Sequence, residues 1–155
     1  MQKAKTFDLK DYVPDIELCK KLKDLGFPQD GGGFYWDIGL TGRLYLCLYR
    51  KNIKDSFFAW DGVYRADVIF IDDDFYQNFV KAPTSGELLS YLPQDFKEEY
   101  VDSEFRIWDD KTNPSFIATD KKEVNARAKL VIHLLEKLNK LHNNSHETKL
   151  SRNKD

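Results

Sequence analysis

The pattern of hydrophobic and polar positions predicts three helices. Residues 15–26 and 120–141 carry apolar side chains at intervals of three and four, the spacing of one helical face. Between them, residues 82–93 form a shorter unit in which Thr84 is the expected N-cap and Glu87 its capping-box partner. We therefore expect a helix towards each end of the chain and one short helix in the middle.

Alternation with a period of two predicts several short strands between these helices. The clearest is 43–50, where leucines face one side, and tyrosine and cysteine face the other. Residues 57–60 and 63–66 flank Asp61 and Gly62, a pair that tolerates the positive φ angles of a type I′ hairpin. Further strands are expected at 34–36, 68–71, 104–108 and 115–119, with a polar loop at 94–103. The tyrosine side is amphipathic, so we expect it to lie open, with helices covering the sheet on one side only.

The order of these elements is typical of the α+β class. We expect a single domain with a largely antiparallel sheet of about five to six strands and three helices on one face. It should span residues 13–142, after a polar N-terminal lead at 1–12 and before a disordered C-terminal tail at 143–155. With 155 residues, 41% of them hydrophobic, the chain is long enough for one core and too short to suggest two domains.

Three segments carry a family resemblance. They are residues 13–36, ending in Phe-Tyr-Trp; residues 82–93, entered through Ala-Pro-Thr; and residues 123–138, beginning Glu-Val-Asn-Ala-Arg-Ala-Lys-Leu. In this order they resemble a family of small uncharacterised proteins of bacteriophages, prophages and mobile elements of gut-type bacteria. The resemblance covers about a third of the chain and implies no activity. A triple glycine at 31–33 and a long middle region at 40–81 depart from the family pattern.

Charge and cysteine content narrow the function classes. The 24 basic and 26 acidic residues give a net charge of -2, which provides no general attraction to nucleic acid or anionic lipid. Cys19 and Cys47 lie among apolar residues, so we expect buried free thiols. No stretch approaches the ~20 apolar residues of a membrane span, and no apolar run follows the lysines near the N-terminus. We expect a cytoplasmic protein that does not bind membranes.

No group of residues predicts a catalytic site, a metal or a cofactor. The glycines at 31–33 could hold a phosphate, but the strand-like residues 34–36 follow where a helix N-terminus is needed, so a flexible turn is favoured. The acidic run 72–74 lacks the later glycine and glutamate of a calcium loop. His142 and His146 have the spacing of metal ligands on a helix, without an evident third ligand.

Aromatic and arginine residues on the predicted strands are the candidate binding site. The candidates are Arg43, Tyr45, Tyr49, Arg50, Trp60, Tyr64, Arg65 and Trp108. If several share the helix-free face, they would suit a protein partner or, alternatively, single-stranded nucleic acid. Otherwise most of these rings fill the core. We expect a non-enzymatic accessory protein that binds a macromolecule, first of all a protein; an enzyme with a dispersed site is a third hypothesis.

Overall fold

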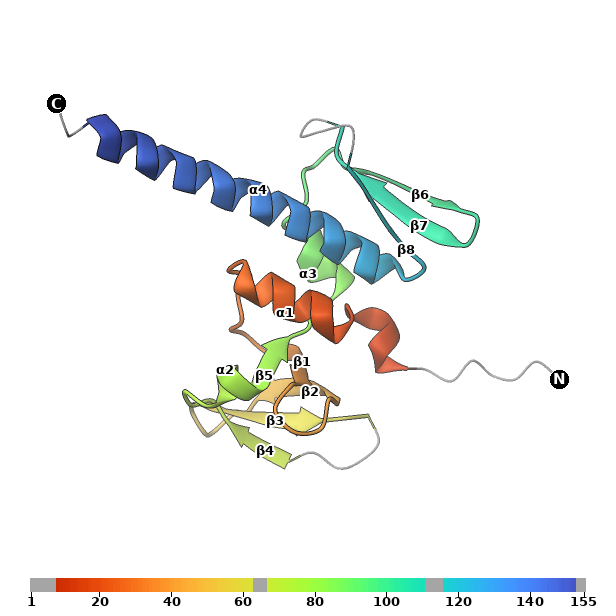
Figure 1. The fold of residues 1–155 in the computed structure, drawn as a ribbon. Helices are drawn as coiled ribbons and strands as arrows, with labels where there is room; N and C mark the ends of the chain where they lie inside the picture. Colours follow the sequence, from red (N-terminus) through yellow and green to blue (C-terminus); the bar gives the residue numbers. More distant parts are fainter. Residues whose placement is uncertain (1–7, 63–66, 111–115, 153–155) are drawn as a thin grey trace.

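Two antiparallel sheets lie on either side of a layer of helices in the computed structural model of the chain, which describes residues 8–62, 67–110 and 116–152 (Figure 1). Sheet A has five strands in the order β4-β3-β2-β1-β5, and sheet B has three in the order β6-β7-β8. The strands are β1 (Gly33–Asp37), β2 (Leu44–Tyr49), β3 (Ser56–Trp60), β4 (Asp67–Phe70), β5 (Phe79–Lys81), β6 (Lys97–Val101), β7 (Glu104–Trp108) and β8 (Ile117–Asp120). The helices are η1 (Leu9–Tyr12), α1 (Ile16–Asp24), α2 (Phe75–Asn78), α3 (Ser85–Leu89) and α4 (Glu123–Arg152). The predicted α+β class is confirmed, as a single compact domain.

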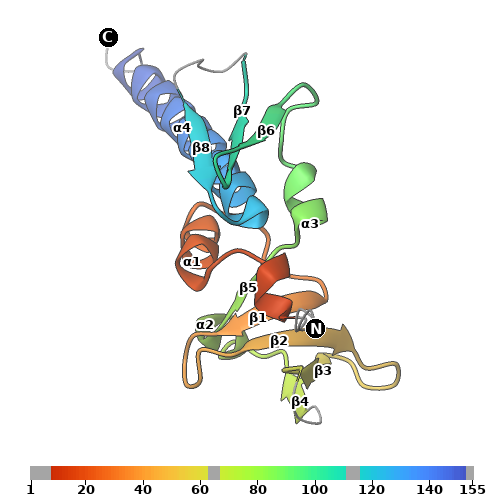
Figure 2. The ribbon, with the colours of Figure 1, turned by 90° about the vertical axis from the view of Figure 1, so that its right-hand side faces the viewer.

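The three predicted helices pack together in the middle of the molecule. α1 lies between sheet A and α4, and sheet B packs on the other side of α4 (Figures 1 and 2). Side chains from α1, α3, α4 and sheet B form a shared core, which includes Leu22, Leu88, Ile107, Leu130 and Val131. The helices therefore lie between two sheets rather than on one face of a single sheet.

Local sequence signals define the ends of the shorter helices. α1 follows Asp15 and ends before Gly26, whose φ of +88° is in the left-handed region. α3 has the predicted capping box: the Thr84 hydroxyl accepts from the Glu87 N–H at 3.3 Å, and the Glu87 carboxylate accepts from the Thr84 N–H at 2.8 Å. Both predictions are confirmed.

Sheet B is the main departure from the predicted fold. Residues 94–103 are predicted to be a polar loop, whereas Lys97–Val101 form β6 and pair with β7. Four of the five β6 residues are exposed, so this strand lacks the apolar alternation by which a half-buried strand is recognised. The apolar residues of the sheet are on its partners, where Ile107 and Ala118 belong to the core beside α4. The expected single sheet is therefore two sheets, of five and three strands.

α4 extends farther than predicted. Its apolar pattern predicts an end near Leu141 and a disordered tail at 143–155, but the helix continues to Arg152. Residues 143–152 contain no glycine or proline that would stop a helix. None of the helices in the described part of the chain is long and apolar enough to cross a membrane.

Sheet A has two apolar faces, because side chains alternate along each strand. The first, which we call the helix face, includes Trp36 and Val80 and packs against α1 and η1. The second, the crossover face, is covered by residues 71–78, which leave β4 at one edge of the sheet and reach β5 at the other. In this segment the Phe75 ring packs edge-on against the Tyr35 ring, with centroids 5.3 Å apart. The sequence pattern does not predict α2 and β5, because elements of four and three residues are too short to show a period.

Candidate functional site

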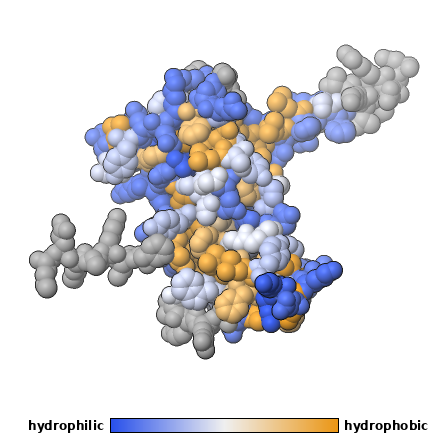
Figure 3. Space-filling model, turned by 180° about the vertical axis from the view of Figure 1, so that it is seen from behind, coloured by the Kyte–Doolittle hydropathy of each residue, from blue (hydrophilic) through white to orange (hydrophobic). Residues whose placement is uncertain are grey.

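The helix face of sheet A is covered over only part of its width. The side chains near α1 and η1 are buried, as Trp36 and Leu44 show. Farther from these helices, five apolar side chains on the same face are 40–62% exposed, and we call them the apolar stripe: Leu48, Phe58, Trp60, Val68 and Phe70. Seen from behind, hydrophobic surface is present on the sheet A end of the molecule, its lower part in that view (Figure 3).

Strand register places the members of the apolar stripe side by side. Leu48 of β2 pairs with Phe58 of β3, which pairs with Val68 of β4. Trp60 and Phe70 lie two residues farther along their strands, on opposite sides of this row. Because strands are about 4.8 Å apart and rise about 3.3 Å per residue, the stripe measures roughly 10 by 13 Å.

The area of the apolar stripe is large for a free surface. Aromatic side chains bury about 150–250 Å² each when fully enclosed, so these half-exposed side chains offer on the order of 400 Å². That is the size of the largest apolar patch on a typical monomer, and such patches are often functional. The stripe is therefore the strongest candidate for a binding surface in the described residues.

A positively charged loop borders one end of the apolar stripe. Residues 50–55 connect β2 to β3 and line a hollow of ≈ 490 Å³. Ser56, which belongs to the helix face by register and is fully buried, donates from its hydroxyl to the Ile53 carbonyl at 3.3 Å, so the loop folds beside this face. Within the described residues, no ion pair joins Arg50, Lys51 or Lys54 to an acidic group.

In the described residues, the opposite end of the apolar stripe carries an ion pair. Arg43, which precedes β2, pairs with Asp61, which follows β3, at 3.4 Å. A carboxylate beside a guanidinium leaves little net charge there. The two ends of the stripe therefore differ: one carries three cations together with the Asp55 carboxylate, and the other carries an ion pair.

The tyrosine side of β2 is not the open face that the sequence predicts. It is the crossover face, where Tyr45 packs against Phe79 with ring centroids 6.2 Å apart, and Tyr49 packs against Phe57 at 4.8 Å. Tyr49 keeps an exposed surface, but Cys47 between the two tyrosines is fully buried. The expectation of an open tyrosine side is wrong because residues 71–78, which carry no long helical pattern, cover it.

The structure does not bring together the six predicted binding residues that lie in the described part of the chain. Tyr45 and Tyr49 are on the crossover face, Trp60 is in the apolar stripe, Arg43 and Arg50 are at the two ends of β2, and Trp108 is in sheet B. The indole N–H of Trp108 donates to the Asp110 carboxylate at 2.8 Å. Tyr64 and Arg65 lie outside the described residues.

Sequence reasoning misses most of the apolar stripe. The leucine alternation assigns Leu48 to the face that helices cover, and Phe58, Val68 and Phe70 are not among the predicted site residues. A signal is present in β3, where Ser-Phe-Phe-Ala-Trp places large apolar residues on both faces of one strand. In a domain with few helices, such a strand indicates that at least one face of its sheet is buried by something other than a helix of the domain, such as a loop segment or a partner.

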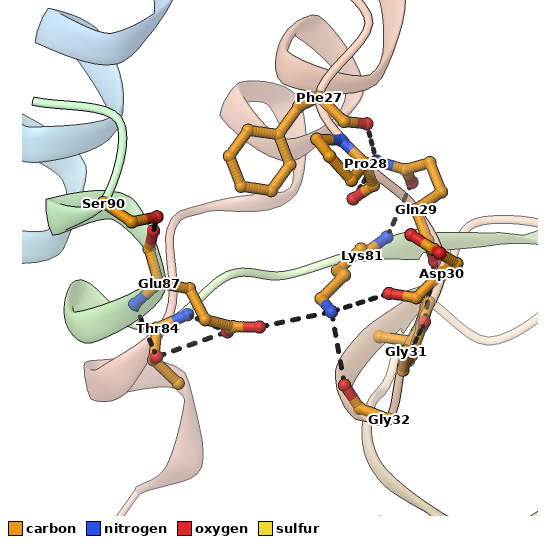
Figure 4. A network of polar contacts seen from close by, with 11 residues as sticks. Phe27, Pro28, Gln29, Asp30, Gly31, Gly32, Lys81, Thr84, Glu87 and Ser90 are labelled. Carbon is orange, nitrogen blue, oxygen red and sulfur yellow. Dashed lines mark hydrogen bonds and ion pairs between the residues drawn. The ribbon is translucent and has the colours of Figure 1, made fainter.

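The triple glycine is a structural loop. The Lys81 ammonium donates to the carbonyls of Asp30 at 2.9 Å and Gly32 at 3.3 Å, and it pairs with the Glu87 carboxylate at 3.2 Å (Figure 4). The Tyr35 hydroxyl donates to two carbonyls of the same loop, those of Gln29 and Gly31. These contacts engage the Lys81 ammonium, the cation nearest the glycines, and join the loop to α3 through Glu87.

The two cysteines are free and buried, as predicted. Burial raises the pKa of Cys19 and of Cys47 to about 12. Thiols of that kind are protonated at neutral pH and react slowly, since the thiolate is the nucleophile. Neither cysteine supports a catalytic function.

A hollow of ≈ 330 Å³ beside α4 is lined by several titratable groups. His133, predicted to be a surface residue, is half-buried and stacks on Phe116 with ring centroids 3.7 Å apart. Burial, more than the nearby Lys137, lowers its pKa. The Lys21 ammonium in this hollow is already paired with Glu136 at 2.8 Å, and Lys129 with Asp120 at 2.8 Å. The arrangement therefore offers no free acid–base pair.

The acidic and histidine-containing segments form no metal site in the described residues. No group of three or more His, Cys, Asp or Glu side chains there is placed to hold a metal ion. Asp72, Asp73 and Asp74 are exposed between β4 and α2. His142 and His146 are one helical turn apart on α4 and have no third ligand in this region.

Comparison with known proteins adds no relative. No family model matches the chain, and no curated protein or solved structure matches it. The likeness of three segments to phage and mobile-element proteins stays a hypothesis. Functional inference therefore rests on the surface that the chain itself presents.

Proposed function

We propose that this chain is a non-enzymatic accessory protein that binds a protein partner through the apolar stripe. The observation that supports this is the group of five apolar side chains, 40–62% exposed on adjacent strands of one sheet face. Phe58, Trp60 and Phe70 supply rings of the type that dominate binding energy at protein interfaces. The likeness of three segments to phage and mobile-element proteins supports a role as an accessory factor of such elements.

A protein suits the apolar stripe better than single-stranded nucleic acid does. Two of the five members of the stripe, Leu48 and Val68, offer no ring on which a base could stack. Arg43 is paired with Asp61, so among the described residues at that end this guanidinium is already engaged by a carboxylate. The net charge of -2 gives no general attraction to a polyanion. The three cations of the β2–β3 loop are what favours nucleic acid as the second candidate.

Affinity capture with matched variants tests the proposal. The wild-type chain, immobilised and exposed to lysate of the bacterium that carries the gene, should retain a specific protein. Leu48→Thr/Phe70→Thr should lose it, because threonine keeps the strand while removing the apolar contact. Tyr100→Thr/Ile117→Thr is the control, since both side chains are exposed on sheet B. Equal capture by all three proteins, with circular dichroism showing them folded, contradicts the proposal.

The nucleic-acid alternative has its own measurement. A labelled single-stranded oligonucleotide is titrated with the wild-type chain at low salt and followed by fluorescence anisotropy. On our proposal no saturable binding is expected. Salt-sensitive binding that Phe58→Ala weakens at least about tenfold would favour nucleic acid instead.

A further inference from the structure

We infer that the segment of the partner that occupies the apolar stripe is an amphipathic helix with acidic residues at one end. This inference rests on the proposed function and specifies the chemistry of the partner. It is supported by the dimensions of the stripe, by the way the chain covers the other part of the same face, and by the charge difference between the two ends.

The dimensions of the apolar stripe match one helix. A helix with its side chains is about 10–12 Å across, and about nine residues span 13 Å at a rise of 1.5 Å each. The stripe measures roughly 10 by 13 Å. Two to three turns with apolar residues at i, i+3, i+4 and i+7 would cover it.

The chain already covers part of this face with such a helix. α1 has nine residues, and its Cys19 side chain is fully buried in the cluster that contains Trp36, Leu44 and Val80 of the helix face. The helix face of sheet A can therefore pack against a short helix. A second helix over β2, β3 and β4 would continue the layer that α1 begins.

An extended strand fits the apolar stripe less well. The free edge of sheet A on this side is β4, so an added strand would pair beside β4 in the plane of the sheet. Phe58 and Leu48 lie one and two strands farther in, respectively, and would stay uncovered. A helix that lies on the face, with its axis along the strands, is wide enough to cover all three strands.

The charges at the ends of the apolar stripe indicate where the acidic residues lie. Arg50, Lys51 and Lys54 surround the hollow of the β2–β3 loop. Asp55 lines it as well, and the acidic run 72–74 starts nearby, since the Ile71 N–H donates to the Asp55 carbonyl at 2.7 Å. That run leaves over the crossover face, whereas the loop folds beside the helix face. Carboxylates on one end of the partner helix would meet these cations, while the Arg43–Asp61 end requires no complementary charge.

Selection from a random library tests the inference while the partner is unidentified. Random 16-residue peptides displayed on yeast are enriched on the wild-type chain and depleted on Leu48→Thr/Phe70→Thr. We expect the enriched peptides to repeat apolar residues every three to four positions and to contain Asp or Glu clustered at one end. Enriched peptides with alternating apolar residues, or without acidic clustering, overturn the inference but leave the proposed function intact. If no peptide depends on the stripe, both fail.

Charge reversal provides the quantitative measurement. An enriched peptide, labelled and titrated by anisotropy at low salt, should bind Lys51→Glu/Lys54→Glu at least about tenfold more weakly than the wild type. Lys121→Glu/Lys140→Glu is the control, with the same charge change at exposed positions near and on α4, and it should bind within about twofold of the wild type. Equal weakening in both variants overturns the assignment of the acidic end to the loop.

A second copy of the chain is the competing occupant. Light scattering with size-exclusion chromatography measures the oligomeric state. The apolar area of the stripe alone falls short of the roughly 800 Å² per partner of a standard interface. A monomer is expected. A dimer that Leu48→Thr/Phe70→Thr converts to a monomer would make the stripe a self-interface and overturn the inference.

Discussion

The two parts of the helix face of sheet A have the same kind of sequence and opposite surroundings. On β2 alone, Leu44 is 3% exposed and Leu48 is 53% exposed, although both point to the same face four residues apart. The difference is the position of α1 and η1, which cover β1, β5 and the start of β2. Apolar alternation therefore identifies a face that can be buried, and the helices decide which part of it is buried.

The largest expected effect is on stability in the covered part. Trp36→Ala should lower the free energy of unfolding by about 3–5 kcal/mol, because it leaves a cavity and removes the hydrogen bond from the indole N–H to the Pro14 carbonyl. Trp60→Ala, in the uncovered part, should cost about 1 kcal/mol, since its ring is 40% exposed. Urea unfolding at 25 °C measures both. Similar losses would mean that the stripe is part of the core.

Thiol labelling should separate the two parts by rate. Leu48→Cys should react with a disulfide reagent at pH 8 at least about 100-fold faster than Leu44→Cys, which is reached only after local opening. Cys19 and Cys47 provide an unreactive background, because burial raises the pKa of each to about 12. Comparable rates for the two engineered cysteines would show that α1 does not protect the start of β2.

Removing Lys81 should weaken the attachment of sheet A to α3. Lys81→Met should cost about 2–3 kcal/mol, because the carbonyls of Asp30 and Gly32 and the Glu87 carboxylate lose a shared donor. Lys20→Met is the control. It removes an exposed i,i+3 pair with Glu17 and should cost less than about 0.5 kcal/mol. Equal effects in thermal unfolding would contradict a structural role for Lys81.

The smallest expected effect is at the hairpin between the covered β1 and the partly covered β2. Burial alone would raise the pKa of Asp37, but the Thr41 hydroxyl and the backbone N–H groups of Leu40, Gly39 and Thr41 lower it below its usual value. The carboxylate therefore stabilises the fold at neutral pH, and this contribution is lost as the pH falls through the lowered pKa. Asp37→Asn should cost about 1 kcal/mol at pH 7 and less near pH 3. A pH-independent difference in urea unfolding would contradict this.

Long periodic elements and capping signals are predictable from the sequence. Which parts of the faces of sheet A are covered by other segments is not. The α1 and α4 patterns, the Thr84–Glu87 box and the β2 alternation are local, so these elements appear in the structure, although α4 continues beyond Leu141 to Arg152. β6 escapes prediction because its residues are mostly exposed, and residues 71–78 because a four-residue helix has no measurable period.

The predicted site differs from the observed surface for a related reason. Whether Tyr45 or Leu48 faces solvent depends on where residues 71–78 and α1 lie, and both placements are set by contacts between distant segments. Trp60 is a predicted site residue because it is aromatic, and its neighbours in the apolar stripe become visible only through strand register.

The contact between Asp15 and Asn125 has a consequence for how the chain is made. The Asp15 N–H donates to the Asn125 side-chain carbonyl at 3.0 Å, and the Asn125 amide donates to the Asp15 carboxylate at 2.8 Å, across 110 residues of sequence. During synthesis, α1 emerges from the ribosome long before α4, the helix against which it finally packs. The amphipathic N-terminal helix must wait for its partner, and such a high sequence separation predicts slow folding that depends on completion of the chain.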